Sequence, residues 1–218
     1  LDPTGAPEPV GTSGRPLPIA VGDLDARGGQ SAEIVLALRR AFPGRRIDIH
    51  RTADPLALLL GDEVRYALVS GPAFFALDEA GGVRPRGPVD AIVPVGFDVV
   101  HLLVPSAAPA LDWEGGVRFG VGEPDGVTAR TAALMAAGLP GTAPTLVEAS
   151  AGGGGGLRAQ AEAVRTGDLD GLLIMAEPGH PLVAELLADG LELAPLGLWG
   201  ARGNRVAFPF LQPVTIPA

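Results

Sequence analysis

The sequence contains neither cysteine nor lysine. Without cysteine the chain forms no disulfide, carries no thiolate nucleophile and offers no cysteine ligand to a metal. Without lysine it cannot contain a P-loop, which ends in Gly-Lys-Ser/Thr, so the five glycines of Gly152–Gly156 are interpreted as a flexible loop. No apolar run is long enough to cross a bilayer.

Basic residues are also sparse. Sixteen arginines stand against 25 acidic residues, which gives a net charge of −9. An acidic chain with no basic stripe argues against nucleic-acid binding. It still allows an anionic small ligand, because a single site can be locally positive in an acidic protein.

The 218 residues are 47% hydrophobic, enough for one large domain or two small lobes with real cores. Glycine (32) and proline (22) are abundant and stand between periodic segments without forming a repeat. This distribution is typical of many short loops and not of collagen or general disorder.

Residues 1–16 are rich in Pro, Gly, Ser and Thr and have no apolar period, so we expect a flexible leader or tether. The chain starts at Leu1 rather than Met, which is typical of a mature or trimmed fragment. Tethers of this kind often follow a lipid anchor or membrane segment, so a membrane tether through the N-terminus is one interpretation, and a cloning remnant is the other.

Short buried-type strands alternate with helices along the rest of the chain, which predicts an α/β fold with parallel sheets. The predicted strands include 17–21, 46–50, 66–70, 91–95, 98–104, 117–121, 145–148, 171–175 and 191–196, and the predicted helices begin near 31, 55, 128, 157 and 181. We expect residues 17–97 to form a first lobe, 98–194 a second, and 195–218 a hinge segment that returns toward the first lobe. Two such lobes predict a cleft, with hinges near Pro94–Phe97 and Pro195–Gly200 and with ligand-facing loops after the strands.

The stretch Asp112–Leu139 is the best candidate for a ligand-anchoring loop. A strand leads through Gly122-Glu-Pro-Asp-Gly126 to a helix that Thr128 is expected to cap. A helix N-terminus has free N–H groups and the positive end of the helix dipole, which suit an anionic group. Thr128, Arg130 and Thr131 add hydroxyls and one guanidinium, although an ordinary strand-to-helix connection has the same N-terminus.

Several segments in this order resemble the TAXI family of TRAP-transporter solute receptors, within the type 2 periplasmic-binding-protein superfamily. The segments are IAVGDLDARGGQSAEIVLALRRAFPG, RTADPLALLLGDEVRYALVSGPAFFAL, DWEGGVRFGVGEPDGVTARTAALMAAGL, LRAQAEAVRTGDLDGLLIMAEPGHPLVAELLADGLELAPL and FPFLQPVTIPA, and the resemblance covers residues 17–218. It implies a two-lobed fold with mainly parallel sheets and a cleft between the lobes. It also implies a periplasmic or extracytoplasmic receptor that binds a small anionic solute, a carboxylate or an amino-acid-like one, for a membrane transporter or sensor.

Combining the resemblance with the residues, we expect a set of ligand contacts drawn from both lobes. They are Gly28, Gly29, Gln30, Ser31, Ser70, Phe74, Gly122, Thr128, Arg130, Thr131 and His180. Arg130 is the expected cation for a carboxylate, because its planar guanidinium binds one with two hydrogen bonds. His50 and His101 lie in predicted strands and are expected to be structural. We expect no enzyme activity, catalytic residue, metal or cofactor, since the histidines show no metal spacing and no Gly-x-Ser-x-Gly elbow exists.

Three departures from the family pattern keep alternatives open. An aromatic residue is missing after Gly28-Gly29, Asp125 adds negative charge to the anion-binding loop, and the chain stops at Ile-Pro-Ala. These departures favour a ligand-free interaction or sensory module on the same fold. A cofactor-biosynthesis lyase on this fold is a further alternative, and it requires a positioned acid/base pair.

Overall fold

The computed structural model describes residues 16–22, 30–77, 83–90, 96–106, 116–124, 126–137, 143–149 and 156–196. They belong to two compact units, and the boundary along the chain lies between Leu68 and Val69. The first unit is a small α/β layer structure, and the second contains the larger sheet with its helices.

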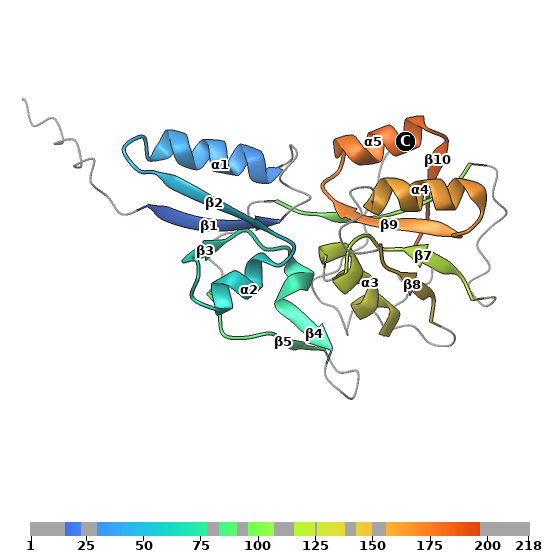
Figure 1. Ribbon diagram of the computed structural model, residues 1–218, viewed down its shortest axis with the longest axis horizontal. Coiled ribbons are helices and arrows are strands. Elements are labelled where there is room, and N and C mark those ends of the chain that lie inside the picture. The colour runs from blue at the N-terminus through green and yellow to red at the C-terminus, as the bar shows by residue number, and fades with distance from the viewer. Residues whose placement is uncertain are drawn as a thin grey trace, which may run out of the picture. The chain divides into compact units, whose positions relative to one another are not determined.

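The first unit is built on a parallel three-stranded sheet of order β2-β1-β3. Its strands are β1 (Leu17–Gly22), β2 (Ile47–Thr52) and β3 (Tyr66–Ala67), and its helices are α1 (Gln30–Ala41) and α2 (Pro55–Leu60). Figure 1 shows α1 and α2 on opposite faces of this sheet.

Strand β1 contributes side chains to both faces of the sheet, because successive side chains of a strand point to opposite sides. Ile19 and Val21 form a small core with Ile47, against which Val35 and Leu38 of α1 pack. Asp54 caps α2, as the sequence predicts, because its carboxylate accepts a hydrogen bond from Ala57 N at 3.2 Å.

The second unit is built on a five-stranded sheet of order β10-β6-β9-β7-β8. Its strands are β6 (Val99–Pro105), β7 (Arg118–Gly120), β8 (Thr145–Val147), β9 (Gly171–Ala176) and β10 (Leu191–Ala194). Its helices are α3 (Val127–Ala137), α4 (Gly156–Thr166) and α5 (Pro181–Ala188). Strands β7, β8 and β9 are parallel, while β6 is antiparallel to both β9 and β10.

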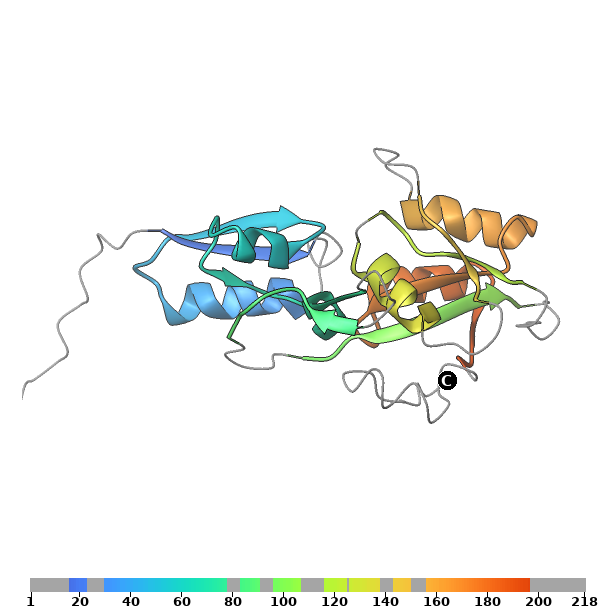
Figure 2. The same ribbon diagram turned by 90° about the horizontal axis from the view of Figure 1, so that it is seen from below.

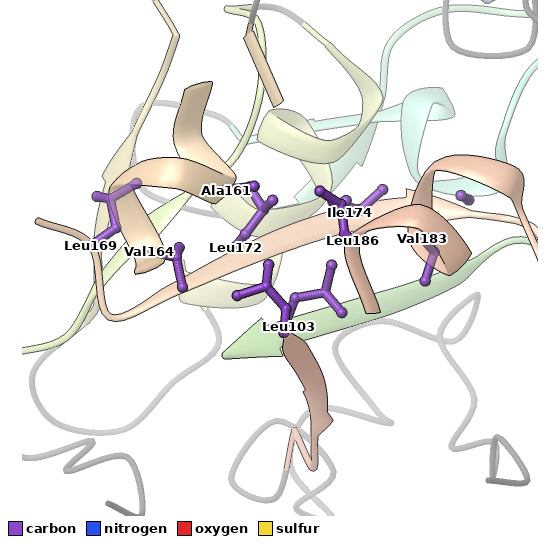
Figure 3. Close-up of a cluster of buried hydrophobic side chains, with 10 residues drawn as sticks. Leu103, Ala161, Val164, Leu169, Leu172, Ile174, Val183 and Leu186 are labelled. Carbon is purple, nitrogen blue, oxygen red and sulfur yellow. The ribbon is translucent and has the colours of Figure 1, made fainter. Parts of the chain in front are cut away.

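Both faces of β9 are covered, so all six of its residues are buried. Leu173 belongs to a core shared with Ala132 and Met135 of α3. Leu172 and Ile174 belong to a second core with α4 and α5 on the other face. Figures 1 and 2 show α3 on one side of the strands and α4 and α5 on the other, and Figure 3 shows the side chains of the second core gathered around β9.

A short segment of the second unit packs on α3. It consists of a 3-10 turn, η2 (Gly71–Phe74), and an antiparallel hairpin of β4 (Phe75–Leu77) and β5 (Val83–Pro85). Both η2 and β4 contact α3. Residues 69–90 therefore cluster with the second unit, although the functional lobe boundaries at 97 and 98 stay a prediction.

The predicted α/β class with mainly parallel sheets is confirmed. The predicted strand 66–70 is too long, since β3 ends at Ala67, and the predicted strands do not include β5. The expected strand 91–95 lies outside the described residues. Of the helices that the structure describes, none combines the length and apolar character needed to cross a membrane.

Candidate functional site

The candidate site is the edge of the five-stranded sheet where β7, β8 and β9 end. Because β6 runs antiparallel to β9, with Val99 opposite Ala176, Asp98 lies at this same edge. Ligands of α/β sheets bind outside the carboxyl ends of the strands. The loops that follow Gly120, Val147 and Ala176 and the segment before Val99 therefore form the border of the candidate site.

The loop between β7 and α3 is held by the protein itself. Gly122 has a φ of 76°, which glycine adopts without strain, and its N–H donates to the side-chain oxygen of Gln160 at 2.8 Å. Ala149 N donates to Gly122 O at 2.7 Å, which ties this loop to the residues after β8. The amide of Gly122, expected to meet a ligand, is thus used inside the fold.

Thr128 does not cap α3, because the helix already begins at Val127. Its buried hydroxyl oxygen instead accepts a hydrogen bond from Met175 N at 3.0 Å. Strand β7 pairs with β9 only as far as Leu172, so no strand is available on that side to accept from Met175. Thr128 supplies the missing acceptor and joins the start of α3 to the end of β9.

Thr131 lies one turn further along α3 and is also buried. Its hydroxyl donates to Val127 O at 2.7 Å, and the same oxygen lies 3.1 Å from the sulfur of Met175. The structure therefore brings Thr128 and Thr131 together around Met175, where both serve the packing of α3 on β9.

Ser70 directly precedes η2, and its hydroxyl donates to Asp98 Oδ2 at 2.7 Å. Asp98 is exposed, so its carboxylate is open to solvent at the sheet edge. Phe74 ends η2 and is half-buried, and η2 packs against α3. Ser70, Asp98 and Phe74 thus border the candidate site beside α3.

His180 is the N-cap of α5, where its Nδ1 accepts from Leu182 N at 3.2 Å. His101 on β6 is 2% exposed and its Nδ1 lies 3.3 Å from Ile174 O. Burial lowers the pKa of His101 below its ordinary value of 6.5, while the carbonyls of Ile174 and Val99 oppose this shift. Since a carbonyl oxygen only accepts, Nδ1 of the neutral His101 ring carries the proton.

Arg130 is half-buried in the first turn of α3 and interacts with the rest of the chain. Glu123 is exposed, and its Oε1 would lie only 2.6 Å from a Cβ placed on Gly156, the first residue of α4. The β7–α3 loop therefore brings a carboxylate of the protein to the start of α4.

Four predicted contacts belong to the first unit. Gly28 and Gly29 lie outside the described residues, and Gln30 and Ser31 open α1 with side chains that are also outside them. Among the residues that the structure does describe, no group of three or more His, Asp or Glu side chains is arranged to hold a metal ion.

Sequence reasoning did not single out Asp98, Gln160 or Met175. Gln160 carries a signal, because it lies with Leu157, Ala161 and Val164 at helical spacing, on an otherwise apolar face of α4. A polar residue on such a face needs a buried partner. Asp98 has no comparable signal, since only the direction of β6 in the sheet brings it to this edge.

No protein-family model matches the sequence, and no curated protein is significantly similar to it. Solved structures are similar to it at low sequence identity. One is the GluR0 ligand-binding core in complex with L-glutamate, with a TM-score of 0.53, 14% identity, and coverage of 84% of this chain and 79% of that one. Another is the arginine-, lysine-, histidine-binding protein ArtJ from Geobacillus stearothermophilus, with a TM-score of 0.52, 17% identity, and coverage of 83% and 76%.

A third similar structure is the probable amino-acid ABC transporter extracellular-binding protein ytmK from Bacillus subtilis. Its TM-score is 0.51 at 11% identity, and the match covers 83% of this chain and 78% of that one. The chain thus has the two-lobed type 2 periplasmic-binding-protein fold that the sequence predicts. The narrower resemblance to TAXI receptors stays a prediction.

Proposed function

We propose that this chain is an extracytoplasmic receptor that binds a small solute with a carboxylate or an amino-acid-like group. The observation that carries the proposal is its fold, which is that of a glutamate-binding core and of amino-acid-binding proteins. Its partner is a membrane transporter or a sensor that recognises the loaded receptor.

The charges at the sheet edge support an amino-acid-like solute over a simple anion. Asp98 offers a carboxylate to an ammonium group, with Ser70 holding one of its oxygens. Arg130 and the N-terminus of α3 offer a positive partner to a carboxylate. A zwitterion places its ammonium group against Asp98 and its carboxylate against Arg130 and the N-terminus of α3. A dianion is repelled by the carboxylates of Asp98 and Glu123.

Native mass spectrometry of the purified protein, followed by thermal shifts with L-glutamate, L-arginine and small dicarboxylates, tests the proposal. A solute at about a hundred times its dissociation constant that binds only the folded state adds about 2.7 kcal/mol of stability. We expect a bound mass or a clear shift with an amino acid.

Two variants locate the site, and one serves as a matched control. Arg130→Ala and Asp98→Asn are each expected to weaken binding by about tenfold to a hundredfold, because each removes a charged hydrogen-bonding group. Arg118→Ala removes an arginine at the opposite end of β7, where it bonds to Gly167 O and Asp170, and is expected to leave binding unchanged. Equal weakening by all three variants would place the solute elsewhere.

One observation favours a second function, a ligand-free interaction or sensory module. The N–H of Gly122, the hydroxyl of Thr131 and Nδ1 of His180 all bond to the chain itself. If the chain is such a module, we expect no co-purified mass and no thermal shift with any compound of the panel. That result would overturn the receptor proposal in favour of the module.

A further inference from the structure

Gln160 is a buried polar side chain on the apolar face of α4. It is 6% exposed and lies beside Ala161 and Val164, which are both fully buried in the core between α4 and β9. Placing a side-chain amide in such a core is unfavourable unless both of its ends find hydrogen-bond partners.

Both ends of the Gln160 amide are bonded, and to different loops. Oε1 accepts from Gly122 N at 2.8 Å, and Nε2 donates to Val147 O at 2.8 Å. The partners fix the orientation of the amide, because an N–H only donates and a carbonyl oxygen only accepts. Gly122 lies two residues after the end of β7 and Val147 is the last residue of β8, so one side chain joins the two neighbouring segments where they leave the sheet.

The surrounding backbone leaves space for this amide. A Cβ placed on Gly120 would lie 2.9 Å from Oε1 of Gln160, closer than real side chains pack. Gly122 has a positive φ, and a Cβ there would lie 3.2 Å from Leu157 of the same helix. The Gly120-x-Gly122 pattern therefore leaves room for two side chains of α4.

Backbone bonds extend the same connection outward. Val121 N donates to Val147 O at 3.1 Å, so this carbonyl accepts from both the backbone and Gln160. Ala149 N donates to Gly122 O at 2.7 Å beyond it. Gln160 and these two backbone bonds together fix Gly122 against Val147 and Ala149, and Gln160 adds the link to helix α4.

We propose that Gln160 is the positioning residue of the solute site: it holds Gly122 and Val147, and with them the start of α3, in the arrangement that binds the solute. This inference rests on the proposed function, in which these loops border the solute. Gln160 itself needs no contact with the solute, since it acts on Gly122 and Val147 from beneath the loops.

The first test measures amide hydrogen exchange by NMR in the full chain without solute. Gln160→Met keeps the length of the side chain and removes both hydrogen bonds. Val164→Ala, a buried apolar change on the same helix, is the matched control for general loss of stability. We expect Gly122 N–H to exchange about tenfold faster in Q160M than in V164A, as loss of a buried hydrogen bond implies.

Gln160→Glu separates positioning from simple packing. A carboxylate still accepts from Gly122 N, but it repels Val147 O until it takes up a proton and becomes a donor. The protection of Gly122 in Q160E is therefore expected to rise as the pH is lowered, whereas that in Q160M is not. Parallel pH profiles for the two variants would overturn the proposal.

The second test measures binding of L-glutamate and L-arginine to the same variants by calorimetry. For the amino acid that binds the wild type, the dissociation constant is expected to rise about tenfold in Q160M and to stay unchanged in V164A. Equal affinities in Q160M and V164A would overturn the positioning role. If neither amino acid binds the wild type, the proposed receptor fails, and the exchange of Gly122 alone confirms or overturns the control of the loops by Gln160.

Discussion

The role of each single residue at the candidate site depends mainly on the side chains and backbone groups that the fold places beside it. Gly120 and Gln160 are a matched pair, because the missing side chain of one makes room for the amide of the other. Strand β7 pairs with β9 only as far as Leu172, and the hydroxyl oxygen of Thr128 accepts the hydrogen bond from Met175 N. A polar residue near the end of a strand can therefore be structural even where a ligand contact is expected.

The pairing of Gly120 with Gln160 predicts a non-additive effect of mutation. Gly120→Ala forces a methyl group against the amide and should destabilise the protein by about 1–3 kcal/mol in urea unfolding. In the Gln160→Ala background the same change should cost less, because the amide is gone and only the contact with Cβ of residue 160, at 3.1 Å, remains. Equal costs in the two backgrounds would show that the amide of Gln160 is not what Gly120 accommodates.

His101 predicts how stability depends on pH. Its pKa in the folded protein is lowered by burial, so between that pKa and 6.5 the unfolded chain binds a proton that the native state does not. Stability should therefore fall as the pH drops below about 6.5, by up to about 1.4 kcal/mol per pH unit for this one group. Chemical denaturation at several pH values measures the slope.

A variant of His101 identifies the source of that slope. His101→Gln keeps a donor for Ile174 O and does not titrate, so the slope just below pH 6.5 should flatten. A slope that survives in H101Q would assign the pH dependence to other groups.

At the scale of elements, the junction of α3 with β9 depends on one hydroxyl. Thr128→Val keeps the shape of the side chain but leaves the buried N–H of Met175 without its acceptor. We expect a loss of about 1–3 kcal/mol in unfolding free energy, and little loss in Thr128→Ser, which retains the oxygen. Unchanged stability in Thr128→Val would show that this hydrogen bond does not stabilise the junction, and a loss in Thr128→Ser would measure the separate contribution of the methyl group.

Most elements of the fold are predictable from local patterns, because apolar period and caps act over a few residues. The spans of α2 and α5 and the buried run of β9 follow this rule. The direction of a strand is not predictable from local patterns, so the sequence of β6 does not show that it is antiparallel to β9. The strands of the hairpin β4–β5 are three residues each, too short to show a period.

The candidate site is less predictable than the elements, because its bonds join distant positions. Ser70 meets Asp98 across 28 positions and Gly122 meets Gln160 across 38. The sequence shows which residues are polar and near a loop, and so it identifies Ser70, Gly122 and Thr128 as candidates. Which partner each one bonds to depends on the sheet order, and that order is a property of the whole second unit.

Among the described residues, the buried apolar clusters of the two units differ greatly in size. In the first unit the core cluster has three fully buried members, Ile19, Val21 and Ile47, while Leu36 and Phe42 of the same unit are about half exposed. In the second unit two clusters cover both faces of β9. Because burial of apolar area is the main favourable term in folding, the first unit should be the less stable one.

This difference predicts unfolding in two steps. In hydrogen exchange followed by mass spectrometry under increasing urea, peptides from β1 should lose protection before peptides from β9. Leu56→Ala, in α2 of the first unit, should lower only the first transition, and Leu173→Ala, in β9, should lower the second, each by about 2–5 kcal/mol. Both leucines are at most 1% exposed, so the two variants are matched in burial and in chemistry. If each variant shifts both transitions together, the two units unfold as one cooperative body, and the small core of the first unit is then stabilised by the second.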